Sequence, residues 1–291
     1  MQKYAKKITK VLVTKVTKTN FKSPIEYRYQ QQSAQIIPSP QQLGTANNSE
    51  NIPNCENPLT NPFIPPTGIV TDRKQFFDRK QEIDRIFEIL NSGSSVALIG
   101  EEGIGKSSLL WAICQQAETR LYSPRQPVFL DLNLVDDEDD FYSTLCQDLG
   151  IAESKGNRLN RALKSHRILL ALDNVGKLTW NGFTRQIRDR LRGLAEGSDA
   201  PLKLILAASE PLDDLFKDSQ DGSKTSPLAG ICLEEEIKPW NETTIRAFIT
   251  ARLAKTSVCF TEEEINQLVQ ESGGHPRRLM QLCYRTYSRY L

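Results

Sequence analysis

The sequence predicts an α/β fold of three layers, in which a mostly parallel five-stranded sheet lies between helices and is followed by a small all-helical lid. Three observations support this prediction. Short apolar runs of strand length alternate with segments of helical periodicity. The runs are continuously apolar, which is typical of parallel strands buried on both faces. After Asn241 the strand patterns stop, and only helical patterns follow.

The predicted elements follow one another in a regular order. A helix is expected at residues 76–90, where apolar residues recur at helical intervals and Gly93 provides a stop signal. Strands are expected at 94–100, 127–135, 167–175 and 201–209, with a weaker one at 231–237. Helices are expected between them at 106–119, 137–149 and 182–195, and in the lid at 241–254, 261–271 and 275–290. The sequence therefore predicts a core over residues 66–238 and a lid over residues 239–291.

The composition excludes several classes of protein. The 291 residues carry 37 Lys and Arg against 36 Asp and Glu, a net charge of +1. The six cysteines share no CxxC spacing, and two histidines are too few for a zinc-finger pattern. No apolar run reaches the roughly 18 residues of a membrane span, and the N-terminus lacks the apolar segment of a signal peptide. We therefore expect a cytoplasmic protein without a transmembrane segment.

Residues 1–65 differ from the rest in charge and composition. Residues 1–30 hold eight Lys and Arg against one Glu, a net charge of +7, which leaves −6 for the remaining residues. Residues 30–66 are rich in Gln, Asn, Ser and Pro and too poor in apolar residues to offset the entropy of ordering. We expect a mostly disordered arm and linker, with a short edge strand at residues 8–18 as an alternative. The arm is either a solubilising leader or a contact for nucleic acid or an anionic membrane.

The strongest motif lies between the first predicted strand and the helix after it. Residues 100–107 read Gly-Glu-Glu-Gly-Ile-Gly-Lys-Ser and fit the pattern GxxxxGK[ST] in its strand–loop–helix setting. Glycines let backbone N–H groups turn inward, and the helix N-terminus adds further donors for phosphate. Lys106 supplies a cation for the β- and γ-phosphates, and Ser107 an oxygen ligand for Mg²⁺. The alternative is an inert glycine-rich turn. The predicted phosphate-binding residues are Gly100, Glu101, Glu102, Gly103, Ile104, Gly105, Lys106, Ser107 and Ser108.

Two further strands end in polar residues that would meet the phosphate loop. Asp173 ends the apolar run 167–173, where it would hold Mg²⁺ or a Mg²⁺-bound water; the alternative is a turn residue. Asn174 follows it, and an amide can orient a water molecule but cannot accept its proton, so we expect slow hydrolysis. Ser209 ends the fourth strand, where it either contacts the γ-phosphate or forms a simple turn.

Two charged rows are open to more than one interpretation. The acidic residues 136–140 either start a helix or form a cation site, and acidic side chains favour a helix start. Arginines on the helix after Asp173 either form a solvated face or include an arginine finger that acts across a subunit boundary. These arginines are Arg185, Arg188, Arg190 and Arg192.

Four segments carry a resemblance to a known family. They read FFDRKQEIDRIFEIL (76–90), GEEGIGKSSLL (100–110), RILLALDN (167–174) and SGGHPRRLMQL (272–282). Together they resemble the signal-transduction ATPases with numerous domains (STAND), within the AAA+ and origin-recognition-like P-loop ATPases. The resemblance implies a P-loop NTPase fold with the phosphate-loop strand central, a helical lid, ATP or ADP with Mg²⁺ as ligands, and nucleotide-controlled opening and closing.

The resemblance also assigns individual residues. Residues 76–80 resemble a Phe-x-Gly-Arg-Glu stretch that borders adenine; Arg79 matches, whereas Asp78 replaces the Gly and Lys80 the Glu. Residues 274–276 resemble the Gly-x-Pro motif of the lid, so that Pro276 would pack against the nucleotide. Arg277 and Arg278 lie where relatives place an arginine that reaches the γ-phosphate.

These features predict an ATP-binding, slowly hydrolysing regulatory switch of STAND/AAA+ type. Its ATPase reaction would convert ATP and water to ADP and phosphate, and the preference for ATP rests on the resemblance and on the absence of an Asn-Lys-x-Asp motif. We expect a nucleotide-dependent homo-oligomer or a separate effector or sensor protein as the partner. The alternatives are a DNA-associated AAA+ ATPase of the origin-recognition or transposition-helper type, which would use the arm 1–30, and a nucleotide-binding scaffold without turnover.

Overall fold

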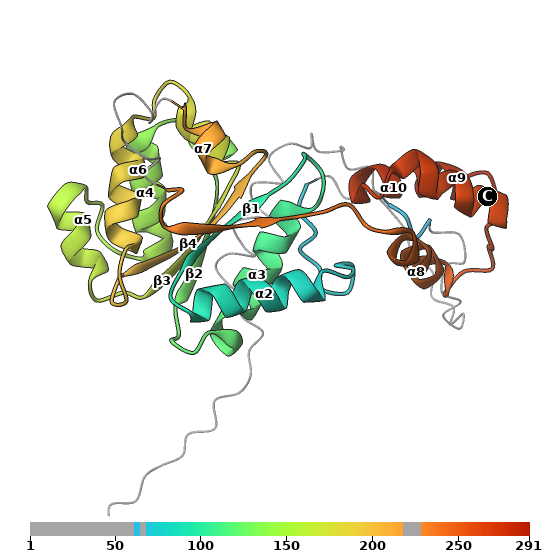
Figure 1. Ribbon diagram of the computed structural model, residues 1–291, viewed down its shortest axis with the longest axis horizontal. Helices are drawn as coiled ribbons and strands as arrows, with labels where there is room; N and C mark the ends of the chain where they lie inside the picture. The colour runs from blue at the N-terminus through green and yellow to red at the C-terminus, as the bar shows by residue number, and fades with distance from the viewer. Residues whose placement is uncertain (1–60, 65–67, 218–227) are drawn as a thin grey trace, which may run out of the picture. The chain divides into compact units, whose positions relative to one another are not determined.

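A computed structural model describes residues 61–64, 68–217 and 228–291 (Figure 1). The predicted arm and its alternative strand at residues 8–18 lie outside the described residues. None of the helices in the described ranges is long and apolar enough to cross a bilayer.

The centre of the fold is a five-stranded parallel sheet, which confirms the predicted fold class. The strands are β1 (Ser95–Ile99), β2 (Gln126–Asp131), β3 (Ile168–Asp173), β4 (Leu202–Ala208) and β5 (Cys232–Glu236). Their order is β2-β3-β4-β1-β5. The expectation that the phosphate-loop strand β1 is central is wrong by one position. Because β3 and β4 fill the space between β2 and β1, the middle strand is β4.

The strands with the most apolar sequences are those that are buried along their whole length. Every residue of β1, β3 and β4 is buried, as expected for parallel strands covered on both faces. The edge strand β5 instead exposes Leu233, Glu234 and Glu236. Charged residues on an edge strand discourage pairing with another chain. This explains why β5 has the weakest strand pattern in the sequence.

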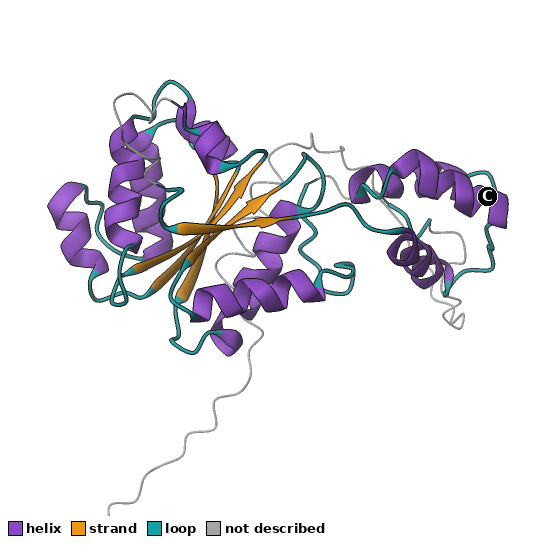
Figure 2. Ribbon diagram, in the orientation of Figure 1, coloured by secondary structure: helices purple, strands orange, loops and turns teal. Residues whose placement is uncertain are grey.

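Helices cover both faces of the sheet (Figure 2). One face packs against α2 (Lys80–Asn91) and α3 (Lys106–Arg120) through a continuous apolar cluster. The other packs against α4 (Glu138–Leu149), α5 (Gly156–Leu163) and α6 (Arg185–Ala195). Short elements complete the core: the 3₁₀ helices η1 (Leu132–Leu134) and η2 (Val175–Thr179), and the helix α7 (Leu212–Leu215).

Two helix boundaries show how local chemistry sets the ends. The helix predicted from residue 76 begins only at Lys80, because Asp78 and Arg79 have positive φ angles of 60° and 67°, which are not helical. Helix α4 begins where the acidic run was expected to start a helix. Its N-cap Asp137 accepts hydrogen bonds from the N–H groups of Asp139 and Asp140.

The lid consists of three helices, α8 (Glu242–Leu253), α9 (Glu262–Ser272) and α10 (Pro276–Tyr287), packed around their own apolar cluster. Phe63 is fully buried in this cluster and stacks on Phe260 with ring centroids 5.7 Å apart. The sequence analysis placed residue 63 in the linker. A single aromatic side chain in a segment rich in Asn and Pro gives no periodic signal, although it fills a hydrophobic gap between helices.

Candidate nucleotide-binding site

The predicted phosphate loop joins β1 to α3, whose first residue is Lys106. Gly103 has a φ of 79°, which favours glycine, and a Cβ atom there would lie 2.7 Å from the His275 ring of the lid, so a larger residue would have to displace that ring. Gly105, the N-cap of α3, also has a positive φ. The loop and the first turn of α3 therefore present backbone donors at a helix N-terminus, the arrangement that binds phosphate.

The Lys106 side chain turns back onto the loop. Its Nζ donates to the carbonyl oxygens of Gly100 (2.5 Å) and Glu101 (2.8 Å). Burial lowers the pKa of Lys106, whereas the nearby carboxylates of Asp173 and Glu102 act in the opposite direction. A phosphate at the loop would offer Lys106 stronger, charge-assisted acceptors than these two carbonyl groups.

Asp173 lies at the end of β3 and is 3% exposed. The Ser107 hydroxyl donates a hydrogen bond to it, and burial, as the largest cause, raises the pKa of Asp173 to about 6. A buried carboxylate beside a hydroxyl is a set of hard oxygen ligands whose desolvation cost a divalent cation would offset. The two residues therefore fit Mg²⁺, which would neutralise phosphate charge and take its remaining ligands from water and phosphate.

Asn174 follows Asp173 and contacts a residue that the sequence analysis did not single out. Its Nδ2 donates to Asp131 Oδ1 at 2.8 Å. Asp131 ends β2 and pairs in register with Asp173, and its charge also raises the pKa of Asp173. The predicted strand 127–135 runs past Asp131, whereas β2 ends at that residue, so the sequence did not mark Asp131 as a strand end.

Ser209 directly follows β4, the strand between β3 and β1, and its side chain is exposed. Since the carboxyl ends of parallel strands meet at one edge, Ser209 lies on the same edge as Asp173 and the phosphate loop. Its contact with phosphate stays a prediction.

The lid reaches the phosphate loop through the start of α10. Arg277 Nη1 donates to Glu102 Oε1 at 3.0 Å, and Pro276 is the first residue of that helix. The preceding Gly274 accepts a hydrogen bond from Trp240 N at 2.8 Å, and a Cβ atom at Gly274 would lie 2.1 Å from Trp240 O. The structure thus brings Arg277 to the loop, where its partner is a loop carboxylate.

Arg79 links the phosphate loop to neighbouring segments through hydrogen bonds. It is 6% exposed, and its guanidinium donates to Ile104 O (3.2 Å), Lys238 O (2.8 Å) and Glu82 Oε1 (2.8 Å). Arg79 therefore joins the phosphate loop to the segment that leaves β5. Its predicted role beside adenine stays a prediction.

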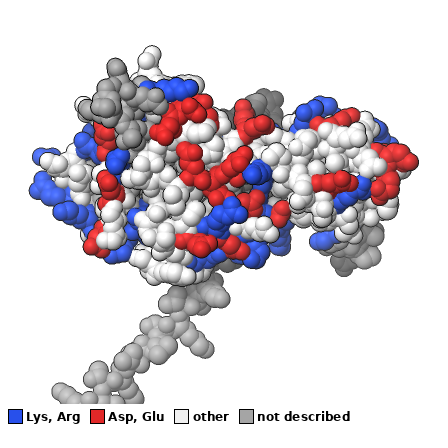
Figure 3. All heavy atoms as spheres, viewed as in Figure 1, with Lys and Arg blue, Asp and Glu red and all other residues white. Residues whose placement is uncertain are grey.

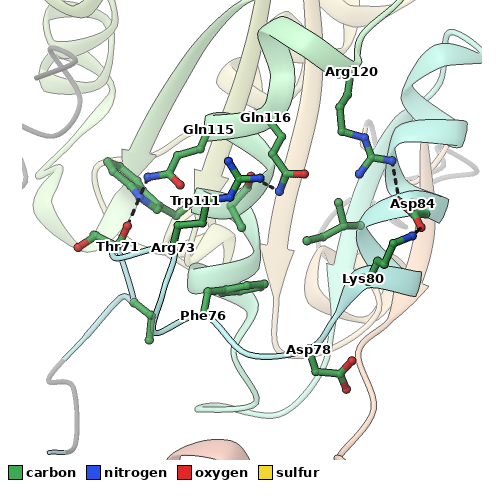
Figure 4. A pocket seen from close by; sticks show the side chains of 13 residues that line it. Thr71, Arg73, Phe76, Asp78, Lys80, Asp84, Trp111, Gln115, Gln116 and Arg120 are labelled. Atoms are coloured by element: carbon green, nitrogen blue, oxygen red, sulfur yellow. Dashed lines mark hydrogen bonds and ion pairs between the residues drawn. The ribbon is translucent and has the colours of Figure 1, made fainter. Parts of the chain in front are cut away.

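A cavity of about 330 Å³ lies between α2, α3 and residues 70–78 (Figure 4). Phe76, Ile83 and Trp111 form apolar parts of its wall, and Arg120 and Lys80 both pair with Asp84 at its rim. Its lining includes Phe76, Asp78 and Lys80 from the predicted adenine border but does not include the phosphate loop. The cavity and the loop are connected by the hydrogen bond from Val70 N to Ser108 Oγ, at 3.0 Å.

Two buried side chains outside the phosphate loop, Trp111 and Arg188, take structural roles. Trp111 is buried and packs edge-to-face on Phe129. Arg188 is buried on α6 with its guanidinium over Phe216, so it is not part of a solvated face. Figure 3 shows acidic side chains gathered across the middle of one face of the α/β core.

Comparisons with known proteins agree with this architecture. Residues 90–216 match the family model described as an AAA domain. No curated protein matches the chain in sequence. A Walker-type ATPase of Pyrococcus abyssi superimposes with a TM-score of 0.57 at 22% identity, covering 75% of this chain and 69% of that one.

Two structures with DNA in their descriptions have a similar fold. The Aeropyrum pernix ORC1 protein in complex with DNA gives a TM-score of 0.55 at 15% identity, over 74% of this chain and 62% of that chain. Drosophila ORC bound to DNA gives 0.57 at 14% identity, over 90% and 67%. This chain thus spans 62% to 69% of the length of these three structures. It has the P-loop NTPase fold of these structures, and residues 90–216 are similar to the AAA domain model.

Proposed function

We propose that this chain is an ATP-binding, slowly hydrolysing regulatory switch of AAA+ type, related to the STAND ATPases. Nucleotide would control how the lid meets the α/β core. The observation that carries the proposal is the ion pair between Arg277 of the lid and Glu102 of the phosphate loop. The loop that would hold the phosphates is also the place where the lid docks.

The ion pair gives nucleotide a direct way to act on the lid. A γ-phosphate in the loop would bring negative charge beside Glu102 and compete with it for the Arg277 guanidinium. ATP and ADP differ by that phosphate, so they would favour different lid contacts. A ligand shifts a conformational equilibrium only by its difference in affinity for the two states, and Arg277 would supply that difference.

A second set of contacts links the phosphate loop to the lid. Arg79 donates to Ile104 O, and its guanidinium also lies 6.0 Å from the Trp240 ring. Trp240 in turn contacts Phe248 of α8, with ring centroids 5.3 Å apart. A change in the loop would therefore be felt at the base of the lid through packed side chains.

Thermal unfolding with and without ATP-Mg²⁺ tests the proposal. Ligand at 100 times its Kd stabilises the folded state by about 2.7 kcal/mol, a shift of roughly 5–11 °C for a protein of this size. Lys106→Ala should lose most of this shift, and Lys255→Ala, an exposed lysine of the lid, should keep it. An unchanged melting temperature of the wild-type chain in ATP-Mg²⁺ would contradict the proposal.

Specific observations also support a DNA-associated ATPase as the second candidate. Residues 1–30 carry a net charge of +7, and two proteins of similar fold are described in complex with DNA. Binding through that arm would weaken steeply as salt rises, since cationic contacts release counterions from the phosphates. DNA affinity measured at several salt concentrations, with and without residues 1–30, separates this candidate from the switch.

The partner of the switch is either a second copy of the chain or a separate effector or sensor protein. Light scattering of the full chain in ATP-Mg²⁺ and in ADP-Mg²⁺ would distinguish them. A larger mass in ATP alone indicates nucleotide-dependent self-assembly, whereas an unchanged mass favours a separate partner.

A further inference from the structure

The carboxyl edge of the sheet holds an acidic side chain, Asp131, to which the proposed function assigns no role. Asp131 ends β2, and Asp173 ends the neighbouring strand β3 at the same level of the register. Asp131 is half-buried, and Asn174 Nδ2 donates to its Oδ1 at 2.8 Å. The three side chains therefore form one row at the carboxyl edge of the sheet, across the neighbouring strands β2 and β3.

The local structural role of Asp131 occupies one of its two oxygens. Asp131 caps η1 by accepting the N–H of Asn133 at Oδ1, 3.0 Å away. The hydrogen bond from Asn174 also ends at Oδ1. Neither contact requires Oδ2, and neither requires a negative charge, since an Asn side chain has an oxygen that would accept both.

Hydrolysis of the β–γ phosphoanhydride bond of ATP needs a proton acceptor, which the amide of Asn174 does not provide. As water attacks, its oxygen forms a bond to the γ-phosphorus, and the bond from phosphorus to the β–γ bridging oxygen breaks with its electrons leaving on ADP. One proton of the water must go to an acceptor. A carboxylate can take it and later release it to solvent, whereas an amide cannot.

We propose that Asp131 supplies this carboxylate and that Asn174 positions it, so that the acid and the amide act together from neighbouring strands. The inference rests on the proposed ATPase function. Asn174 has φ 57° and ψ 46°, a left-handed conformation that Asn tolerates better than other side chains. That conformation brings its amide across to β2, where it fixes the orientation of the Asp131 carboxylate.

The decisive comparison is between Asp131→Asn and the exchange variant Asp131→Asn/Asn174→Asp, each in the full chain. Asp131→Asn keeps the cap and the hydrogen-bond acceptor but removes the charge. We expect ATP turnover to fall about 100-fold or more, with the Kd for ATP changed less than about threefold. The exchange variant restores a carboxylate in the row, so its ATP turnover should be at least about tenfold higher than that of Asp131→Asn. Asp136→Asn, an exposed acid on the following loop, should turn over like the wild type.

A binding measurement provides a readout besides turnover. ADP with aluminium fluoride mimics the phosphoryl group under attack by water, so it should raise the melting temperature of the wild type above its value in ADP alone. Asp131→Asn should lose this increment and keep the shift caused by ADP. If Asp131 served only to cap η1, Asp131→Asn would change the melting-temperature shifts caused by ADP and by ADP with aluminium fluoride to the same extent.

Three results would overturn the assignment of Asp131. They are wild-type turnover in Asp131→Asn, loss of ATP affinity together with turnover in that variant, and ATP binding without turnover in the wild type. In the last case the switch would survive as a binding module while the role of Asp131 would not. Failure of the wild type to bind ATP would instead contradict the proposed function itself.

Discussion

The α/β core and the lid are stabilised by different kinds of side chain. The core clusters consist mainly of Leu, Ile, Val and Ala on the strands and on the helices that cover them. The lid cluster includes Phe63, Phe248, Phe260 and Tyr287, and its partly buried neighbours include Phe77. Phe63 and Phe77 precede α2 and belong to neither the three lid helices nor the sheet.

This difference indicates that the lid does not complete its own core. A unit of about 50 residues is only marginally stable by itself, and here the segment before α2 adds Phe63 and Phe77 to its apolar cluster. The same segment carries Arg79, which donates to the phosphate loop. The segment before α2 therefore contacts both the lid cluster, through Phe63 and Phe77, and the phosphate loop, through Arg79.

The largest effect is expected from removing the ring of Phe63, which lies outside the lid helices but packs in their apolar cluster. Phe63→Ala deletes a fully buried ring that contacts three other rings, which should lower the free energy of unfolding by about 3–5 kcal/mol. Chemical denaturation of both proteins measures it. Phe63→Leu, which keeps most of the apolar volume, should cost much less. A loss below about 1 kcal/mol in Phe63→Ala would show that the lid closes its core without Phe63.

The next largest effect is expected from Asp173→Asn, a substitution in the α/β core. Its pKa of about 6 exceeds the ordinary 3.8, so between these values the folded state binds more protons than the unfolded chain. Stability is therefore lost as pH rises through about 6. The shift corresponds to roughly 3 kcal/mol at neutral pH. Asp173→Asn should melt at a higher temperature than the wild type at pH 7.5, with the difference shrinking towards pH 4.

The matched control for Asp173→Asn is Asp136→Asn, whose melting temperature should follow the wild type across the pH range. ATP-Mg²⁺ should stabilise the wild type more than Asp173→Asn, because Mg²⁺ offsets the cost of the buried charge only where a charge is present. Equal stabilisation of both proteins would remove Asp173 from the metal site.

The sequence predicted those parts of the molecule that repeat a simple pattern. All five strands and the phosphate loop were found, because continuous apolar runs and glycine spacing are local signals. Helix α5 was missed, since only Leu159 and Leu163 of its eight residues are buried. Asp131 and Phe63 were missed for another reason. Their roles come from neighbours far along the chain, Asp173 and the lid helices, and no local pattern reveals which strand or helix will lie beside them.

A smaller effect is expected from the lid side of the site, on ligand binding. Arg277→Ala should weaken ATP binding by about 1.5–3 kcal/mol, the range for a hydrogen bond to a charged group, and leave ADP binding nearly unchanged. Isothermal titration with both nucleotides measures the difference. Arg285→Ala, which removes an exposed arginine near the other end of α10, is the control. Equal losses for ATP and ADP would contradict a contact between Arg277 and the γ-phosphate.

The smallest effect concerns the ion pair itself. The Glu102 side chain is 90% exposed, so its pair with Arg277 should contribute at most about 1 kcal/mol to folding, and less as salt rises. Glu102→Gln should therefore leave the melting temperature nearly unchanged while tightening ATP binding severalfold, because Arg277 no longer has a competing carboxylate. If Glu102→Gln weakened ATP binding instead, the carboxylate would be assisting the nucleotide rather than competing with it. The lid would then dock through the packed contacts around Trp240, and Arg277 would not discriminate between ATP and ADP.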